Sequence, residues 1–86
     1  MKNMEKNLKA LANRRRLAIL KYLRKNKEAS VAELAHEIDL SFKATSKHLI
    51  ILSAIDIVEK EQRSLQMFYR LSANQKPPVK YIISVL

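Results

Sequence analysis

Lys43, Ala44, Ser46 and Lys47 bring two ammonium donors, a hydroxyl and a small methyl group into one short stretch of the chain. In a helix of about 3.6 residues per turn, these side chains share one side. Ammonium groups donate to guanine or phosphate, a hydroxyl contacts any of several groups, and alanine fits a thymine methyl. The pattern predicts base contacts in the major groove of DNA. The alternative is an ordinary solvated helix face.

Three flanking residues extend this candidate surface. Ser41 is expected to cap the helix and to lie close to DNA. Phe42 either touches a thymine methyl or packs over the preceding turn. His48 either forms a local hydrogen bond or contacts a phosphate.

The helix that carries these residues is the second of a closely spaced pair. Ser30 and Glu33 form a capping box at the start of SVAELAHEI, and only Asp39 and Leu40 separate that helix from SFKATSKHLIIL. We expect the second helix to turn a stripe toward the core, made of Thr45, Leu49 and Leu52.

A β-hairpin is predicted directly after the helix pair. VEKEQ leads through a short basic turn to LQMFYRL, in which Leu65, Met67, Tyr69 and Leu71 alternate with more polar residues. A helix-turn-helix followed by a hairpin is typical of a winged-helix DNA-binding domain. We therefore predict a mainly α fold with a small β-hairpin (α+β), with residues 1–86 as one winged helix-turn-helix domain.

The basic residues of the hairpin are Lys60, Arg63 and Arg70. Such a wing lies along the DNA backbone or in the minor groove, where arginine is favoured, and Arg63 is the best placed near the tip. Glu59 and Glu61 oppose binding. Arg70 is equally consistent with a structural ion pair to the neighbouring strand.

Three consecutive arginines, Arg14 to Arg16, stand at the expected start of a helix. Helix N-termini attract anions, so this cluster is either a phosphate clamp or a solvated patch.

The net charge of the chain favours a polyanionic partner, because 17 Lys and Arg against 8 Asp and Glu give a net charge of +9. Nucleic acid and an anionic membrane surface both fit.

Metal binding, catalysis and membrane insertion are not expected. The chain has no cysteine, and His36 and His48 are its only histidines, without a carboxylate cluster around them. We find no phosphate-binding glycine loop and no nucleophile with a base, and we expect no cofactor. LAILKYL is interrupted by Lys21 and is too short to span a bilayer, so no signal peptide or membrane span is predicted. We expect a cytoplasmic location, which the absence of cysteine fits.

Apolar stripes occur at both ends of the chain. Residues 4–12 are predicted to form a first helix, and Asn13 to cap a second helix that frays near Lys27. VKYIISVL, after Pro77 and Pro78, is expected to be a helix, with a strand as the competing prediction. We predict that both end helices form a homodimer interface, the alternative being that they complete a monomeric core. The candidate interface residues are Met4, Leu8, Leu11, Val79, Ile82, Ile83 and Leu86.

Glycine is absent from the sequence although the predicted fold turns often. Asp39 and Asp56 stand where helices should end, and Ser64 stands at the hairpin tip. Asp is one of the few non-glycine residues that tolerate a left-handed backbone. We expect these residues to replace glycine at a small cost in stability.

From residue 8 to residue 71 the chain resembles the ArsR family of bacterial and archaeal winged-helix repressors. LKALANRRRLAILKYL looks like the opening of the family, SVAELAHEIDLSFKATSKHLIIL is similar to its helix-turn-helix, and FYRL resembles the end of its wing. For Arg16, which matches the opening of the family, the resemblance implies a partly structural role. The usual glycines before and within the wing are Asp56 and Ser64 here. Phe42 and Ile50 replace residues that are commonly polar, which affects base reading rather than the fold.

The resemblance implies a homodimeric repressor whose first and last helices form the two-fold interface. Many members sense metals through Cys on the helix spelled VAELAHEI here, or through Asp and His on the last helix; neither set is present. From the resemblance as a whole we expect sequence-specific binding to double-stranded DNA, with the two recognition helices of a dimer about 34 Å apart. The expected location is a prokaryotic cytoplasm, in association with the nucleoid. A winged-helix protein-interaction module and a sequence-independent chromatin-like protein remain alternatives.

Overall fold

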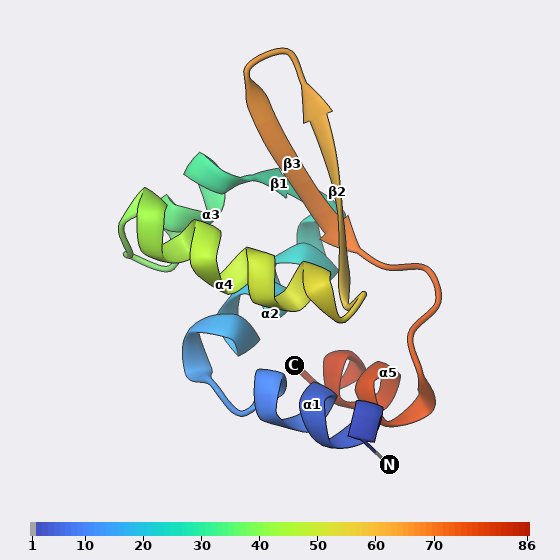
Figure 1. Ribbon diagram of the computed structural model, residues 1–86. Helices are drawn as coiled ribbons and strands as arrows, with labels where there is room; N and C mark the ends of the chain where they lie inside the picture. The colour runs from blue at the N-terminus through green and yellow to red at the C-terminus, as the bar shows by residue number, and fades with distance from the viewer. Residues whose placement is uncertain (1) are drawn as a thin grey trace.

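The computed structural model describes residues 2–86 (Figure 1). The described elements, in chain order, are α1 (Lys2–Leu11), α2 (Arg14–Asn26), β1 (Glu28–Ser30), α3 (Val31–Glu37), α4 (Phe42–Ala54), β2 (Val58–Arg63), β3 (Gln66–Leu71) and α5 (Pro77–Ser84). This is the predicted α+β winged helix-turn-helix, in which α3 and α4 form the helix-turn-helix and β2 and β3 form the wing.

Side-chain caps from Asn13, Ser30 and Ser41 determine where α2, α3 and α4 begin. The Asn13 side chain accepts from the backbone N–H groups of Arg15 and Arg16 at 2.9 and 3.1 Å, which caps α2 as predicted. The Ser30 hydroxyl accepts from the N–H of Glu33 at 3.1 Å and starts α3. Each cap satisfies a backbone donor that lacks a partner within the helix. At the other end of the chain, residues 79–84 of VKYIISVL lie in α5 and Val85 is its C-cap, so the helix prediction is confirmed over the strand.

The sheet has three antiparallel strands in the order β1-β3-β2. β1 was not predicted, because three residues carry too little periodicity to be distinguished from a helix cap. It pairs with the wing through Glu28 opposite Arg70 and Ser30 opposite Phe68. The prediction of Leu65 as a strand residue was wrong, since β3 begins at Gln66 and Leu65 lies in the turn at the tip.

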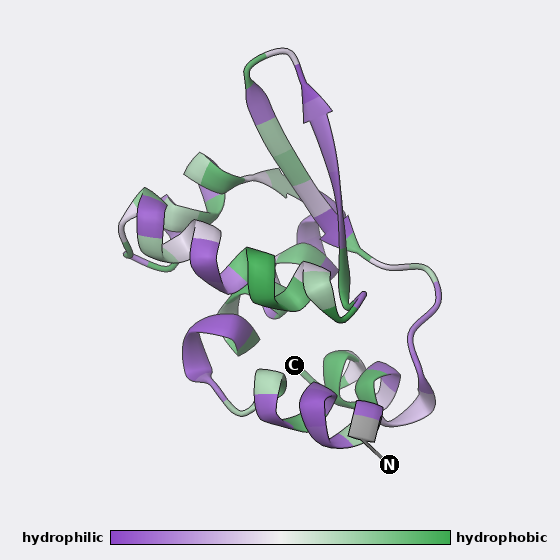
Figure 2. Ribbon diagram, viewed as in Figure 1, coloured by the Kyte–Doolittle hydropathy of each residue, from purple (hydrophilic) through white to green (hydrophobic). Residues whose placement is uncertain are grey.

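The core forms around α2, which contacts α1, α4, α5 and the sheet. Ile19, Leu20 and Leu23 of α2 are fully buried, together with Leu49 and Leu52 of α4. Burying each such side chain contributes about 1.5–3 kcal/mol relative to leaving it in water. Figure 2 shows apolar residues recurring along the helices and a largely hydrophilic edge strand β2. The core therefore fixes α4 in orientation by its buried stripe.

The turns use non-glycine residues with positive φ, as predicted for three of them. Asp39, Asp56 and Ser64 have φ values of 53°, 61° and 57°. Lys27, between α2 and β1, has a φ of 62° and was not anticipated. A left-handed backbone costs a residue with a Cβ about 1–2 kcal/mol.

Part of the predicted dimer interface lies in the interior of the single chain. Leu11, Val79 and Ile83 are only 4%, 2% and 5% exposed and belong to the core. For these three residues the interface prediction is corrected in favour of the alternative, because packing on α2 leaves them no surface for a partner. Within residues 2–86, no helix is long and apolar enough to cross a bilayer.

Candidate nucleic-acid interface

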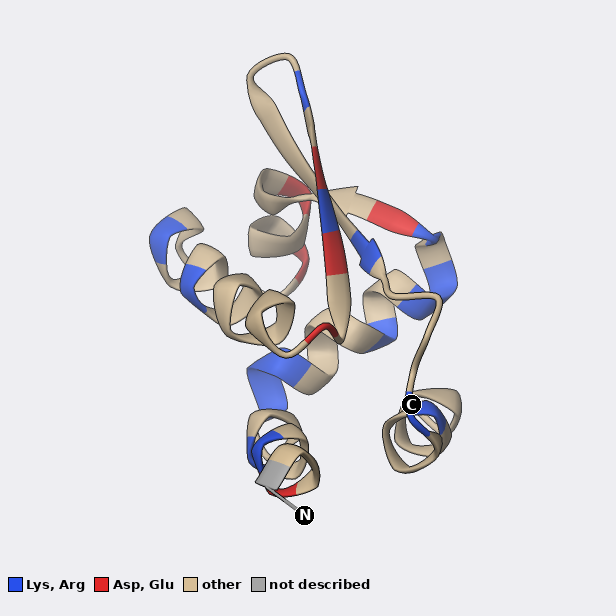
Figure 3. Ribbon diagram, turned by 45° about the vertical axis from the view of Figure 1, so that its right-hand side comes forward, with Lys and Arg blue, Asp and Glu red and all other residues tan. Residues whose placement is uncertain are grey.

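One face of α4 is anchored in the core and the opposite face is exposed. Thr45, Leu49 and Leu52 have no exposed surface, which confirms the predicted inward stripe. Lys43 and Lys47 are exposed on the other side, one helical turn apart, and they form the two basic bands on α4 in Figure 3. Ammonium groups on the outer side of a rigid helix are available to a partner as large as a DNA duplex.

The outer face of α4 changes character along its length. Lys43, Ser46 and Lys47 are followed at the same helical spacing by Ile50, which is 58% exposed. Phe42, at the start of the helix, is 59% exposed. After the apolar Phe42, the first half of this face is cationic and polar, and at Ile50 the face becomes apolar.

Ser41 holds the start of α4. Its hydroxyl accepts from the N–H of Ala44 at 3.1 Å, and its carbonyl accepts from the buried Thr45 hydroxyl at 2.8 Å. The Thr45 hydroxyl would be costly to bury without this partner. Ser41 therefore positions the residues that follow it and is itself exposed at the helix end.

His48 makes a specific contact with α2. The Nε–H of Arg16 donates to His48 Nδ1 at 3.2 Å, and Nη1 of Arg16 donates to the carbonyl of Ala10 at 3.1 Å. Partial burial, and then the charges of Arg16 and Arg15, hold the pKa of His48 below its ordinary value. A neutral imidazole that accepts from Arg16 ties the recognition helix to the start of α2.

Arg15 braces the turn between the two helices of the motif. Its Nη1 donates to the carbonyl of Ile38 at 2.6 Å and to that of Asp39 at 3.3 Å. A cation at a helix C-terminus satisfies carbonyls that have no partner in the helix. For Arg15 the structure thus gives a role that neither predicted alternative described, whereas Arg14 is exposed. Arg16 has the structural role that the resemblance implied. Ala10 is six residues from Arg16, but the other partners lie more than 20 residues away along the chain, so no local pattern indicated them.

Arg63, the predicted minor-groove residue, is held by the protein itself. Nη1 and Nη2 of its guanidinium donate to the two carboxylate oxygens of Glu28 at 2.6 and 2.8 Å, and Nη2 also donates to Glu61 at 3.2 Å. The guanidinium carbon lies 4.6 Å from the centre of the Phe68 ring. Hydrogen bonds from Arg63 lower the pKa of both carboxyl groups.

Arg70 forms the ion pairs that were its structural alternative. Its Nε donates to Glu59 and its Nη1 to Glu61, both at 3.1 Å. These residues share one face of the wing with Arg63. Lys60 is exposed and, being opposite Tyr69 in the register, lies on the other face, with its ammonium away from this network.

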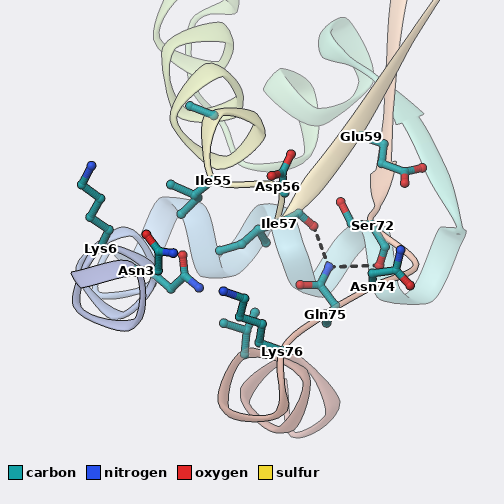
Figure 4. A pocket seen from close by; sticks show the side chains of 13 residues that line it. Asn3, Lys6, Ile55, Asp56, Ile57, Glu59, Ser72, Asn74, Gln75 and Lys76 are labelled. Carbon is teal, nitrogen blue, oxygen red and sulfur yellow. Dashed lines mark hydrogen bonds between the residues drawn. The ribbon is translucent and has the colours of Figure 1, made fainter. Parts of the chain in front are cut away.

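A cleft of about 510 Å³ separates α1 from α5 below the α4–β2 turn. Figure 4 shows Asn3 and Lys6 on one side, Lys76 on the other, and Gln75 hydrogen-bonded to the carbonyls of Ile57 and Ser72. In the view of Figure 3, α1 and α5 lie apart from one another. Among the described residues, no group of three His, Cys, Asp or Glu side chains could hold a metal ion.

Three features of the structure define its class. The helix-turn-helix packs on α2, the three-stranded sheet carries a projecting wing, and the second helix of the motif has exposed lysines. Together they define a winged helix-turn-helix DNA-binding protein. Comparison with known proteins agrees, because residues 13–60 match the family model described as bacterial regulatory protein, arsR family. The chain belongs to the ArsR family and is a DNA-binding transcriptional regulator.

Its relatives span nearly the whole chain. The sequence is 40% identical over 93 residues to the transcriptional activator HlyU of Vibrio cholerae, covering 100% of this chain and 82% of HlyU. The structure of reduced HlyU from Vibrio cholerae superposes with a TM-score of 0.83 at 39% identity, covering 98% of this chain and 84% of that one.

Two further solved structures are similar. NolR from Sinorhizobium fredii has a TM-score of 0.82 at 32% identity, covering 98% of this chain and 80% of that one. A homodimeric winged helix-turn-helix domain from Mycobacterium bovis has a TM-score of 0.83 at 26% identity, covering 98% and 74%. The family and fold are therefore supported by independent comparisons.

Proposed function

We propose that the protein binds a palindromic operator in double-stranded DNA as a homodimer, with α4 of each copy in a major groove. The observation that carries this proposal is the position of Lys43 and Lys47, exposed on the side of α4 opposite its buried stripe. Ser46 and Ala44 lie between them and supply groups that discriminate bases. Ser41 and His48 hold the helix, and Lys60 adds a cation on the wing.

The end helices are proposed as the two-fold interface. Met4 and Leu8 of α1 are 43% and 45% exposed, although they continue the stripe whose last member, Leu11, is buried. Ile82 and Leu86 are only partly covered by the single chain. A second copy would cover these side chains together with the cleft between α1 and α5. The Mycobacterium bovis neighbour is a homodimer, which supports the proposal.

In such a dimer two copies of α4 would lie about 34 Å apart and enter successive major grooves on one side of the duplex. We propose that the dimer represses transcription where its operator overlaps a promoter, because bound protein excludes polymerase. HlyU is named an activator, so the position of the operator relative to the promoter would decide whether the bound protein represses or activates transcription. The proposed setting is a prokaryotic cytoplasm and its nucleoid, without a metal or cofactor and without catalysis.

Lys43→Ala and Lys47→Ala test the placement of α4. Each variant should lower operator affinity about three- to tenfold and reduce the slope of log affinity against log salt by about one, because one phosphate or base contact is lost. Lys25→Ala, at the far end of α2, is the control with the same change in charge. The operator is first selected from random duplexes, and affinities are measured by gel shift. Unchanged affinity in both α4 variants contradicts the placement.

A protein-interaction module is the second candidate, favoured by the exposed Phe42 and Ile50. The affinity of a protein docked on these two apolar side chains would depend weakly on salt concentration. The affinity for DNA through several phosphates instead falls steeply as salt concentration rises. A salt titration with the selected duplex separates the two. Competition between that duplex and random DNA separates a regulator from a chromatin-like protein.

A further inference from the structure

The tip of the wing presents an apolar side chain to solvent. Ser64 and Leu65 form the turn between β2 and β3, and Leu65 is 96% exposed. Figure 1 shows the hairpin extending well beyond the helices, with this turn at its far end. The Gln62 side chain donates to the Ser64 carbonyl at 3.4 Å, which links the turn to its own strand.

The tip has no cation of its own to offer. Residues 64–69 contain neither Lys nor Arg. Arg63, the nearest guanidinium, donates from two nitrogens to Glu28 on β1 and lies over the Phe68 ring. Bidentate pairing of this kind fixes geometry as well as charge. Moving Arg63 to DNA would break these contacts and leave the Glu28 carboxylate unpaired near phosphates, while Glu61 would keep only its bond from Arg70.

The ion pair between Arg63 and Glu28 links the tip of the wing to the rest of the sheet. Glu28 lies on β1, against the body of the protein, and Arg63 is the last residue of β2. The pair therefore ties the far end of the hairpin to the edge of the sheet across 35 residues of sequence. Leu65 projects from a supported turn rather than from a loose loop.

We infer that Leu65 enters the minor groove as an apolar wedge, beside the major groove that α4 occupies. This inference rests on the proposed function. The minor groove is about 6 Å wide, which admits a two-residue turn whose other member is a small serine. Leucine is among the residues that insert between base pairs and kink the duplex. Insertion requires partial unstacking, which is easiest at pyrimidine–purine steps such as TA.

The wedge has two measurable consequences. The operator carries a flexible TA or CA step at the position of each wing, rather than the stiff, narrow A-tract that a minor-groove arginine would prefer. In addition, Leu65 contributes affinity without releasing counterions, since it carries no charge. Its removal therefore weakens binding without changing the salt dependence, unlike the removal of Lys43.

The experiment compares Leu65→Ala, Leu65→Met and Leu65→Lys on the selected operator, with each variant first checked for an unchanged melting temperature. Leu65→Ala should lower affinity about tenfold at an unchanged salt slope, and Leu65→Met should retain most of it. Leu65→Lys should not restore wild-type affinity at physiological salt. A 2-aminopurine at the wing step should brighten with wild-type protein and remain quenched with Leu65→Ala.

Wild-type affinity and step preference in Leu65→Ala would overturn the inference. So would tighter binding and a steeper salt slope in Leu65→Lys, because the tip would then lie along phosphates. If Lys43→Ala still weakens binding in those cases, the proposed function stands and only the wedge fails. Failure of the wild-type protein to bind any duplex would remove both.

Discussion

At the level of single residues, the arginines at the start of α2 organise the DNA-binding motif from behind. Arg15 satisfies carbonyls at the end of α3, and Arg16 joins the end of α1 to His48 on α4. None of these contacts needs DNA. Cations that composition alone would assign to phosphate therefore hold the recognition helix in position, and they do so before any ligand arrives.

Partial burial of His48, and then the charges of Arg16 and Arg15, give the fold a pH dependence. The folded-state pKa of His48 lies below its ordinary value of 6.5, so the unfolded chain takes up the proton first as pH falls. The free energy of unfolding should therefore decrease as pH drops below 6.5, and it should be insensitive to this group above that pH. His48→Gln retains an acceptor for Arg16 but does not titrate, so its urea denaturation should show a shallower pH slope between about pH 5 and 7.

The exposed His36 on α3 provides the matched control. His36→Gln makes the same chemical change on an exposed side chain away from Arg16. If His48→Gln and the wild-type protein follow the same pH profile, burial and the two arginines do not lower the pKa of His48 in solution.

At the level of elements, the chain makes its turns with residues that pay a conformational cost. Lys27 follows the last residue of α2 and has a φ of 62°. Asp39 and Asp56 lie in the turns after α3 and α4 and have φ values of 53° and 61°. The two aspartates suit this backbone better than lysine does, because a short polar side chain can hydrogen-bond locally. Lys27 is thus the turn at which a glycine should stabilise the fold most clearly.

Lys27→Gly should raise the free energy of unfolding by about 0.5–1 kcal/mol, the relief of left-handed strain less the entropy that glycine adds to the unfolded chain. Lys21→Gly is the control, since Lys21 is an exposed residue in the middle of α2. It should lose about 1 kcal/mol through poor helix propensity. Equal losses in both variants, measured by chemical denaturation, would contradict the role given to Lys27.

At the level of the whole molecule, the single chain leaves its two end helices apart. α1 and α5 each pack on α2, and the cleft between them is lined by both. Tyr81 and Val85 of the C-terminal segment are 68% and 62% exposed, and Met4 and Leu8 of α1 are 43% and 45% exposed. This much uncovered apolar surface on a small protein favours association.

Leu8→Glu should convert the proposed dimer to a monomer, because a carboxylate would be buried at the interface without a partner. Light scattering should show the mass halved. Operator affinity should fall more than about tenfold, since the two half-sites would no longer be bound by linked recognition helices. Ala32→Glu adds the same charge on exposed α3 and should leave the mass unchanged. A wild-type protein of monomeric mass would itself refute the interface.

The sequence alone determined the elements whose signals are local. Capping serines and Asn13, the stripe of Thr45, Leu49 and Leu52, and the alternation in β3 are read within one or two turns of chain, so the helix-turn-helix and wing were predictable. With them came the exposure of Lys43 and Lys47. Tertiary structure alone decided the partners of Arg15, Arg16 and Arg63, which lie 23, 32 and 35 residues away. A guanidinium carries the same charge in every environment, and only folding selects whether its donors meet a carbonyl, an imidazole, a carboxylate or a phosphate.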